Sequence, residues 1–117
     1  MNSERSSSRG RVHYGVARVD LRLPGADGLK AKRALLNRAR AALTDELGVS
    51  VAEVGAQDVW QRAVLGITIA ASTATGVDRV LERVTAVLER DPRLEVLTVE
   101  ELADTLDAGD GGPMTPP

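Results

Sequence analysis

The hydrophobic residues of this chain alternate with polar ones in four short runs and recur at helical spacing in two longer ones. Alternation is typical of a strand with one buried face, because successive side chains point to opposite sides. In the first run, Arg18, Asp20 and Arg22 separate the apolar positions Ala17, Val19, Leu21 and Leu23. The sequence therefore predicts strands at Val12–Leu23, Val49–Val54, Arg62–Ala71 and Leu94–Val99.

The two longer runs each carry one apolar stripe, which is typical of a helix with one buried face. The predicted helices are Leu29–Leu47 and Val77–Arg90. Gly48 favours a left-handed end to the first helix, and Pro92 excludes continuation of the second. We expect Asp27 to cap the start of the first helix, and residues 72–76 to cap the second.

The resulting order of strand, helix, strand, strand, helix, strand predicts an α+β fold of the ferredoxin-like βαββαβ type. We expect a four-stranded antiparallel sheet with both helices on one face, because each helix has only one apolar stripe. The other face of the sheet is then exposed. Its expected apolar residues suggest self-association or a possible homodimer, and they are Val12, Tyr14, Val16, Val64 and Ala70.

A chain of 117 residues has room for one domain, which we place at residues 11–103. Residues 1–10 are rich in serine and arginine, and residues 104–117 are acidic and rich in proline and glycine. Both segments are expected to be disordered tails. Residues 100–106, where the domain meets the second tail, are expected to fray into a short helix.

The composition argues against catalysis and against metal or cofactor binding. The chain has no cysteine, and its one histidine, His13, has no acidic residue near it in sequence. Glu53 and Asp58 are the one carboxylate pair worth weighing, but loop polarity and an ion pair with Arg62 explain them as well. No apolar run is long enough to cross a membrane, and the start of the chain does not read as a signal peptide, so we expect a cytoplasmic protein.

The concentrated charge feature is a basic segment in the first predicted helix. The candidate RNA-binding or anion-binding residues are Lys30, Lys32, Arg33, Asn37 and Arg40. They form a ridge beside the buried stripe, except for Lys32, which is expected to be free near the helix start. The alternative is an ordinary solvated face that is balanced by acids such as Asp45 and Glu46.

Two stretches resemble a known family. Gly28-Leu29-Lys30-Ala31-Lys32-Arg33 opens the first helix, and Gln57-Asp58-Val59-Trp60-Gln61-Arg62-Ala63 spans the middle hairpin. They are similar to the YlxP-like family, small bacterial proteins carried as a domain of unknown function. The resemblance implies a ferredoxin-like fold, no established activity, and genes that often lie in translation operons. Ala56 stands where the family often has histidine, which argues against an imidazole or metal ligand in that loop.

These observations leave two functional hypotheses open. The first is a non-catalytic, translation-associated factor that contacts ribosomal RNA or a ribosome-associated protein through the basic helix. A second contact would come from the hairpin residues Gln57, Asp58, Trp60, Gln61 and Arg62. The alternative is a homodimeric regulatory module that senses a small molecule and uses the open sheet face.

Two details refine the first hypothesis. We expect Trp60 to pack against the edge of the core, although it could instead anchor a partner. RNA recognition by stacking on the sheet is disfavoured, because the predicted strand at Arg62–Ala71 has no aromatic residue. No sequence-specific reading of DNA is expected.

Overall fold

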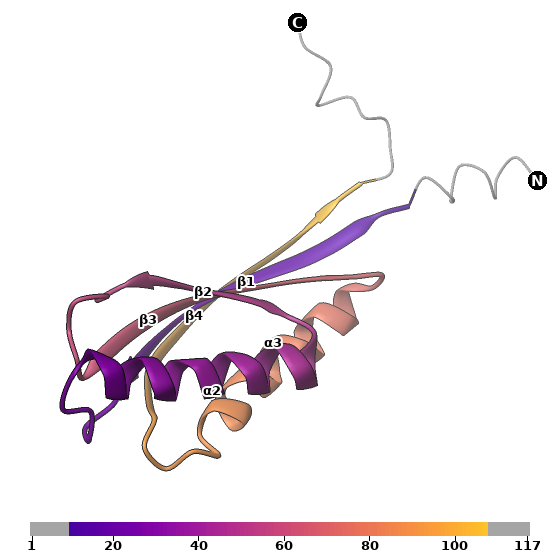
Figure 1. The fold of residues 1–117 in the computed structure, drawn as a ribbon. Helices are drawn as coiled ribbons and strands as arrows, with labels where there is room; N and C mark the ends of the chain where they lie inside the picture. Colours follow the sequence, from indigo (N-terminus) through magenta and orange to yellow (C-terminus); the bar gives the residue numbers. More distant parts are fainter. Residues whose placement is uncertain (1–9, 108–117) are drawn as a thin grey trace, which may run out of the picture.

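The computed structural model describes residues 10–107 and contains six elements in the order βαββαβ. They are β1 (Val12–Arg22), α2 (Leu29–Leu47), β2 (Ser50–Gly55), β3 (Arg62–Ala71), α3 (Ala74–Leu88) and β4 (Glu95–Leu106). The sheet order is β2-β3-β1-β4, and every neighbouring pair of strands is antiparallel. Both helices lie on the same side of the sheet (Figure 1). The predicted ferredoxin-like α+β fold is confirmed.

The last strand is where the sequence prediction was wrong. Residues 100–106 do not form a helix but extend β4, because they pair with the first half of β1 from Arg18↔Glu100 to Val12↔Leu106. Residues 104–106 therefore belong to the sheet and not to a tail. The predictions for residues 1–9 and 108–117 lie outside the described residues.

Two of the three predicted helix caps are confirmed, at the end of α2 and at the start of α3. Gly48 ends α2 in the left-handed region with φ 68, and its N–H donates to the Thr44 carbonyl at 3.0 Å. Thr73 caps α3, because its hydroxyl accepts a hydrogen bond from the N–H of Gly76 at 2.9 Å. The Asp27 prediction was wrong. The N-cap of α2 is Gly28, one residue later, and no side chain there accepts a hydrogen bond.

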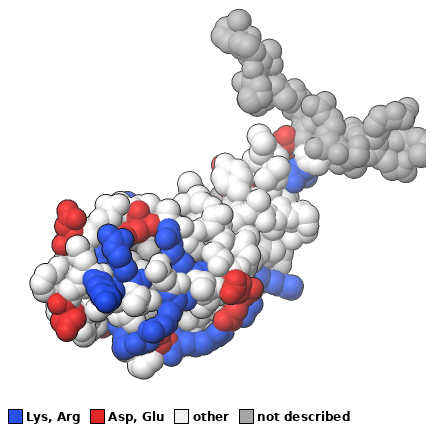
Figure 2. Space-filling view, in the orientation of Figure 1, with Lys and Arg blue, Asp and Glu red and all other residues white. Residues whose placement is uncertain are grey.

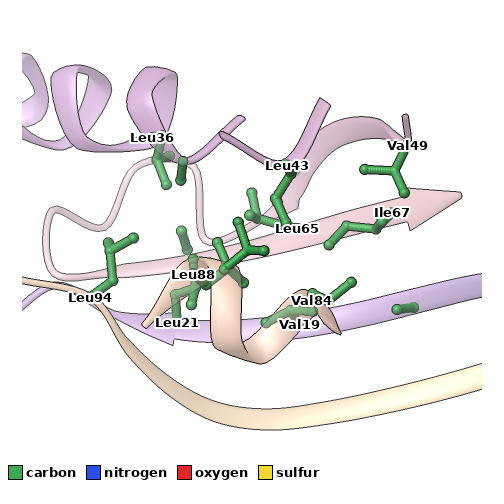
Figure 3. Packing of buried hydrophobic residues seen from close by; sticks show 14 of the residues in the cluster. Val19, Leu21, Leu36, Leu43, Val49, Leu65, Ile67, Val84, Leu88 and Leu94 are labelled. Atoms are coloured by element: carbon green, nitrogen blue, oxygen red, sulfur yellow. The ribbon is translucent and has the colours of Figure 1, made fainter. Parts of the chain in front are cut away.

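The core fills the space between the helices and one face of the sheet. Figure 3 shows aliphatic side chains from both layers meeting there, with Leu21 and Leu65 among those from the sheet and Leu43 and Leu88 from the helices. All four are at most 1% exposed. Because the chain contains no phenylalanine, the packing density of this core depends on branched aliphatic residues.

Close contact between α3 and β1 depends on Gly15. A Cβ atom at this position would lie 2.7 Å from Val77 Cγ1 and 2.9 Å from Leu81 Cδ1. Real Cβ atoms essentially never come this close to a neighbour, so a side chain here would displace the Val77 and Leu81 side chains or α3 itself. Gly25 makes a natural comparison, since a Cβ atom there meets nothing within 4 Å.

We predict that Gly15→Ala lowers the free energy of unfolding by about 1–3 kcal/mol through overpacking. Gly25→Ala should change it by less than about 0.5 kcal/mol, as surface substitutions usually do. Urea unfolding of both variants, followed by circular dichroism, measures the difference. Equal stability of the two variants would show that α3 can move away from β1 without cost.

Candidate binding surface at helix α2 and the β2–β3 loop

Lys32 is buried, so the prediction that it is free near the helix start and available to RNA or an anion was wrong. Its side chain is 2% exposed, which makes it the buried charged residue of the described chain. It lies four residues before Leu36 and eleven before Leu43, so it occupies the buried stripe of α2. Its stem packs with the leucines, and its ammonium group reaches the loop between β2 and β3.

The ammonium group holds this loop by three hydrogen bonds to backbone carbonyls. Nζ donates to Ala56 O at 2.7 Å, to Val59 O at 2.8 Å and to Gln57 O at 3.3 Å. A lysine ammonium group has three protons, so its donors are fully used. Ala56 adopts φ 57, an uncommon conformation for a residue with a side chain. The loop thus curls around the ammonium group with its carbonyls pointing inward.

Glu53 supplies the counter-charge for this buried lysine. Its Oε2 lies 3.0 Å from Nζ, and its side chain is 23% exposed. The protons of Nζ are directed at the carbonyls, so Oε2 forms an ion pair but accepts no hydrogen bond from the described residues. The lysine clamp, meaning Lys32 with Glu53 and the three loop carbonyls, therefore joins α2, β2 and the loop. Sequence reasoning gave Glu53 a different partner, Arg62, and that was wrong.

A second set of hydrogen bonds ties the same loop to the connection between β1 and α2. Leu23 N donates to Gln61 O at 2.9 Å, and the Gln61 side-chain amide donates to Ala26 O at 3.3 Å. The candidate contact residues of the hairpin therefore stand on a backbone that is held from two sides. Their side chains are exposed: Gln57, Asp58, Trp60, Gln61 and Arg62.

The sequence favoured packing of Trp60 against the edge of the core, and this prediction was wrong. Its side chain is 50% exposed, and its neighbour Val59 is 48% exposed. An indole with half of its surface in solvent, on a loop that is fixed by hydrogen bonds, is available to a partner. The reading of Trp60 as a partner anchor stays a prediction.

The remaining ridge residues are exposed along one side of α2. We call Lys30, Arg33, Asn37 and Arg40 the basic ridge. Arg40 also donates from Nη2 to the carbonyl of Val51 at 3.1 Å, which places this end of the ridge beside the edge strand β2. Arg33 lines a hollow of about 230 Å³, whose other walls include Gln57 and Asp58 of the loop. The structure thus brings Arg33 of the predicted ridge beside Gln57 and Asp58 of the predicted hairpin, whereas Arg62 lies on the open face of the sheet.

Two arginines that follow α3 are already paired with acids. Arg90 pairs with Glu46, and this contact lowers the pKa of that carboxyl. Arg93 donates to Asp91 and lowers the pKa of Asp91 to about 2. Figure 2 shows lysine and arginine side chains gathered on the helical side, with acidic side chains around them. Among residues 10–107, by contrast, Lys30 and Arg33 form no ion pair, and neither do Arg38, Arg40, Arg79 and Arg83 on the two helices.

The open face of the sheet divides into a charged half and an apolar half. In the charged half, Arg18 pairs with Glu100 and Arg22 with Glu95. In the apolar half, Val12, Tyr14 and Val16 are exposed as predicted, Ala70 is exposed and Val64 is partly buried. Leu102 joins them with a 66% exposed side chain. Sequence reasoning missed it because residues 100–106 were expected to be helical.

The groups weighed for chemistry do not assemble into a reactive site in the described part of the chain. His13 Nδ1 lies 3.0 Å from the hydroxyl of Thr105. Glu53 faces Lys32 instead of forming a pair with Asp58. Within residues 10–107, no three acidic or histidine side chains cluster as metal ligands would. Neither described helix has the length and apolarity needed to cross a membrane.

Comparison with known proteins gives one matching family and one curated relative. The family model described as "Protein of unknown function (DUF503)" matches residues 14–101. The protein named "Uncharacterized protein YlxP" of Bacillus subtilis (strain 168) is 35% identical over 81 residues, which is 69% of this chain and 88% of that protein.

Two solved structures match this chain at low sequence identity. The de novo designed protein Foldit4 has a TM-score of 0.45 at 17% identity, and the match covers 80% of this chain and 99% of that one. A C-terminal segment of the alpha subunit of aIF2 from Pyrococcus abyssi has a TM-score of 0.40 at 20% identity, and the match covers 80% and 49%.

The lysine clamp predicts a large loss of stability when Lys32 is replaced by methionine, a side chain of similar volume. Lys32→Met should lower the free energy of unfolding by about 3 kcal/mol or more, because it leaves Glu53 and the loop carbonyls without their partner. Arg33→Met, next to it on the exposed side, should change stability by less than about 0.5 kcal/mol. Urea unfolding at neutral pH compares the two, and a Lys32→Met variant as stable as Arg33→Met would contradict the clamp.

Proposed function

The chain belongs to the DUF503 family of proteins of unknown function, and we propose that it is a non-catalytic module that binds ribosomal RNA. The contact surface would be the basic ridge together with the β2–β3 loop. The single observation that carries the proposal is that Arg33, which is exposed and forms no ion pair within the described residues, shares a hollow with Gln57 and Asp58 of the loop.

The spacing of the ridge suits a phosphate backbone. Lys30 and Arg40 are ten positions apart on one helix, which corresponds to about 15 Å at 1.5 Å per residue. Arginine and lysine contact phosphates without reading bases, so this surface would recognise charge and shape. The genes of the YlxP-like family, which this chain resembles, often lie in translation operons, and this favours RNA of the ribosome as the partner.

The β2–β3 loop would supply the second part of the contact. RNA-binding proteins commonly stack unpaired bases on aromatic side chains and hydrogen-bond their edges with polar ones. The loop offers Trp60 for stacking, and Gln57 and Gln61 for hydrogen bonds, on a backbone fixed by the lysine clamp. A fixed loop loses little conformational entropy on binding, which favours affinity.

We predict steep salt dependence for binding to purified ribosomal subunits. If about three phosphate contacts carry the interaction, affinity should fall roughly 40-fold between 50 and 200 mM salt. Lys30→Glu/Arg33→Glu should weaken binding at 50 mM salt by more than about 10-fold and flatten the salt slope by about two contacts. Co-sedimentation over a salt series measures both quantities.

The matched control reverses two exposed arginines on the neighbouring helix. Arg79→Glu/Arg83→Glu makes the same change in net charge on α3, outside the basic ridge. It should keep most of the affinity and most of the slope. Equal losses in the two double variants would show that only net charge matters, and absence of co-sedimentation at 50 mM salt would overturn the proposal.

A further inference from the structure

We propose that the open face of the sheet is a self-association surface on which two copies of this chain pack face to face. In this arrangement Leu102 of each copy packs on β3 of the other, next to the hollow at Gly66. The inference concerns the face of the sheet opposite the helices, and it does not depend on RNA binding by the basic ridge.

The charged half of the open face needs no external partner. Arg18 pairs with Glu100, Arg22 with Glu95, and Asp20 accepts a hydrogen bond from Thr98 at 2.9 Å. Each pair joins β1 to β4 across the ladder, so the charges are satisfied within one copy. What remains on this face without a partner among the described residues is its apolar half, and neither Asp104, opposite Tyr14, nor Arg62 on β3 forms an ion pair there.

The apolar residues make a patch of a size that monomers rarely expose. The patch comprises Val12, Tyr14, Val16, Val54, Leu102 and Leu106, each between 37% and 66% exposed. Together these fractions correspond to an apolar area on the order of 500 Å², at the upper end of the largest patches found on monomers. Two copies would bury about 1,000 Å² of apolar surface before any polar rim is counted, enough for a specific interface.

The patch contains both a projection and a hollow. Leu102 is its most exposed member. The hollow has a volume of about 400 Å³, and it lies where the two halves of the face meet, because its lining includes Gly66, Val54, Val16 and Leu102 as well as Arg18, Glu100 and Glu101. It exists because Gly66 has no side chain and Val54 covers the glycine from one side, 3.1 Å from where a Cβ atom would stand.

The positions of the two features fit a two-fold axis. Leu102 lies on β4 and Gly66 on β3, and β1 runs between these strands. An axis that follows β1 between two facing sheets exchanges the β4 side of one copy with the β3 side of the other. Each Leu102 then approaches β3 of the partner copy at the level of Thr68, next to Gly66, because both Leu102 and Thr68 pair with Val16. One surface thus supplies both halves of the contact, as an isologous interface requires.

Sedimentation velocity of the full chain over a range of concentrations tests the proposal. The wild type should form a dimer, and Leu102→Glu should raise its dissociation constant at least 30-fold, as expected for an interface hot spot. Val59→Glu, the same kind of change on the β2–β3 loop, should leave the dimer intact, and so should Lys30→Glu/Arg33→Glu. A wild type that stays monomeric, or a Leu102→Glu variant that associates like the wild type, would overturn the inference.

Cross-linking tests the geometry independently of stability. Because the chain has no cysteine, one introduced thiol is the only one present. Val16→Cys lies near the proposed axis and should form a disulfide with its own copy under mild oxidation. Ala34→Cys, exposed on α2, should form it at least ten times more slowly. Equal rates would exclude the face-to-face arrangement, even if the protein is dimeric.

Discussion

The position of the β2–β3 loop against α2 depends on one buried ammonium group, that of Lys32. Lys32 is inside the apolar stripe of α2, where an uncompensated charge would be strongly unfavourable. Three inward-facing carbonyls and the carboxylate of Glu53 compensate it. The lysine therefore fixes the conformation of the β2–β3 loop as well as its distance from α2. The exposed hairpin side chains and the hollow beside Arg33 both follow from that one contact.

The fold was predictable because its hydrophobic periods are clear. The bounds of α2 and β3 agree with the sequence prediction, since their apolar stripes are long and end at glycine or polar residues. Residues 100–106 were not predictable in the same way. Their local sequence, Glu-Glu-Leu-Ala, favours a helix. Pairing with β1 provides backbone hydrogen bonds over the whole segment and overrides that preference. The missed Leu102 has the same cause.

The two parts of the candidate site were predictable from sequence, but the contact between α2 and the β2–β3 loop was not. The ridge cations and the hairpin were both identified from sequence, yet nothing in the sequence joins them directly. The signal was the position of Lys32 itself, which shares the helical stripe of Leu36 and Leu43. Lysine is so rarely buried that a surface role is the natural first interpretation. For Trp60 the opposite bias operated, because a lone aromatic residue suggests a core position, whereas half of this indole is in solvent.

The proposed RNA surface and the proposed dimer surface lie on opposite sides of the sheet. The first offers cations to a partner, and the second offers apolar side chains. On the open face the charges pair across β1 and β4, which leaves an apolar contact for a surface of the same kind. On the helical side Lys30 and Arg33 are exposed and form no ion pair with described residues, which suits a polyanion. A face-to-face dimer would direct both helical layers outward, so each basic ridge would stay accessible. A dimer with two basic ridges would also bind a large RNA more tightly than a monomer with one ridge, because the second contact becomes intramolecular.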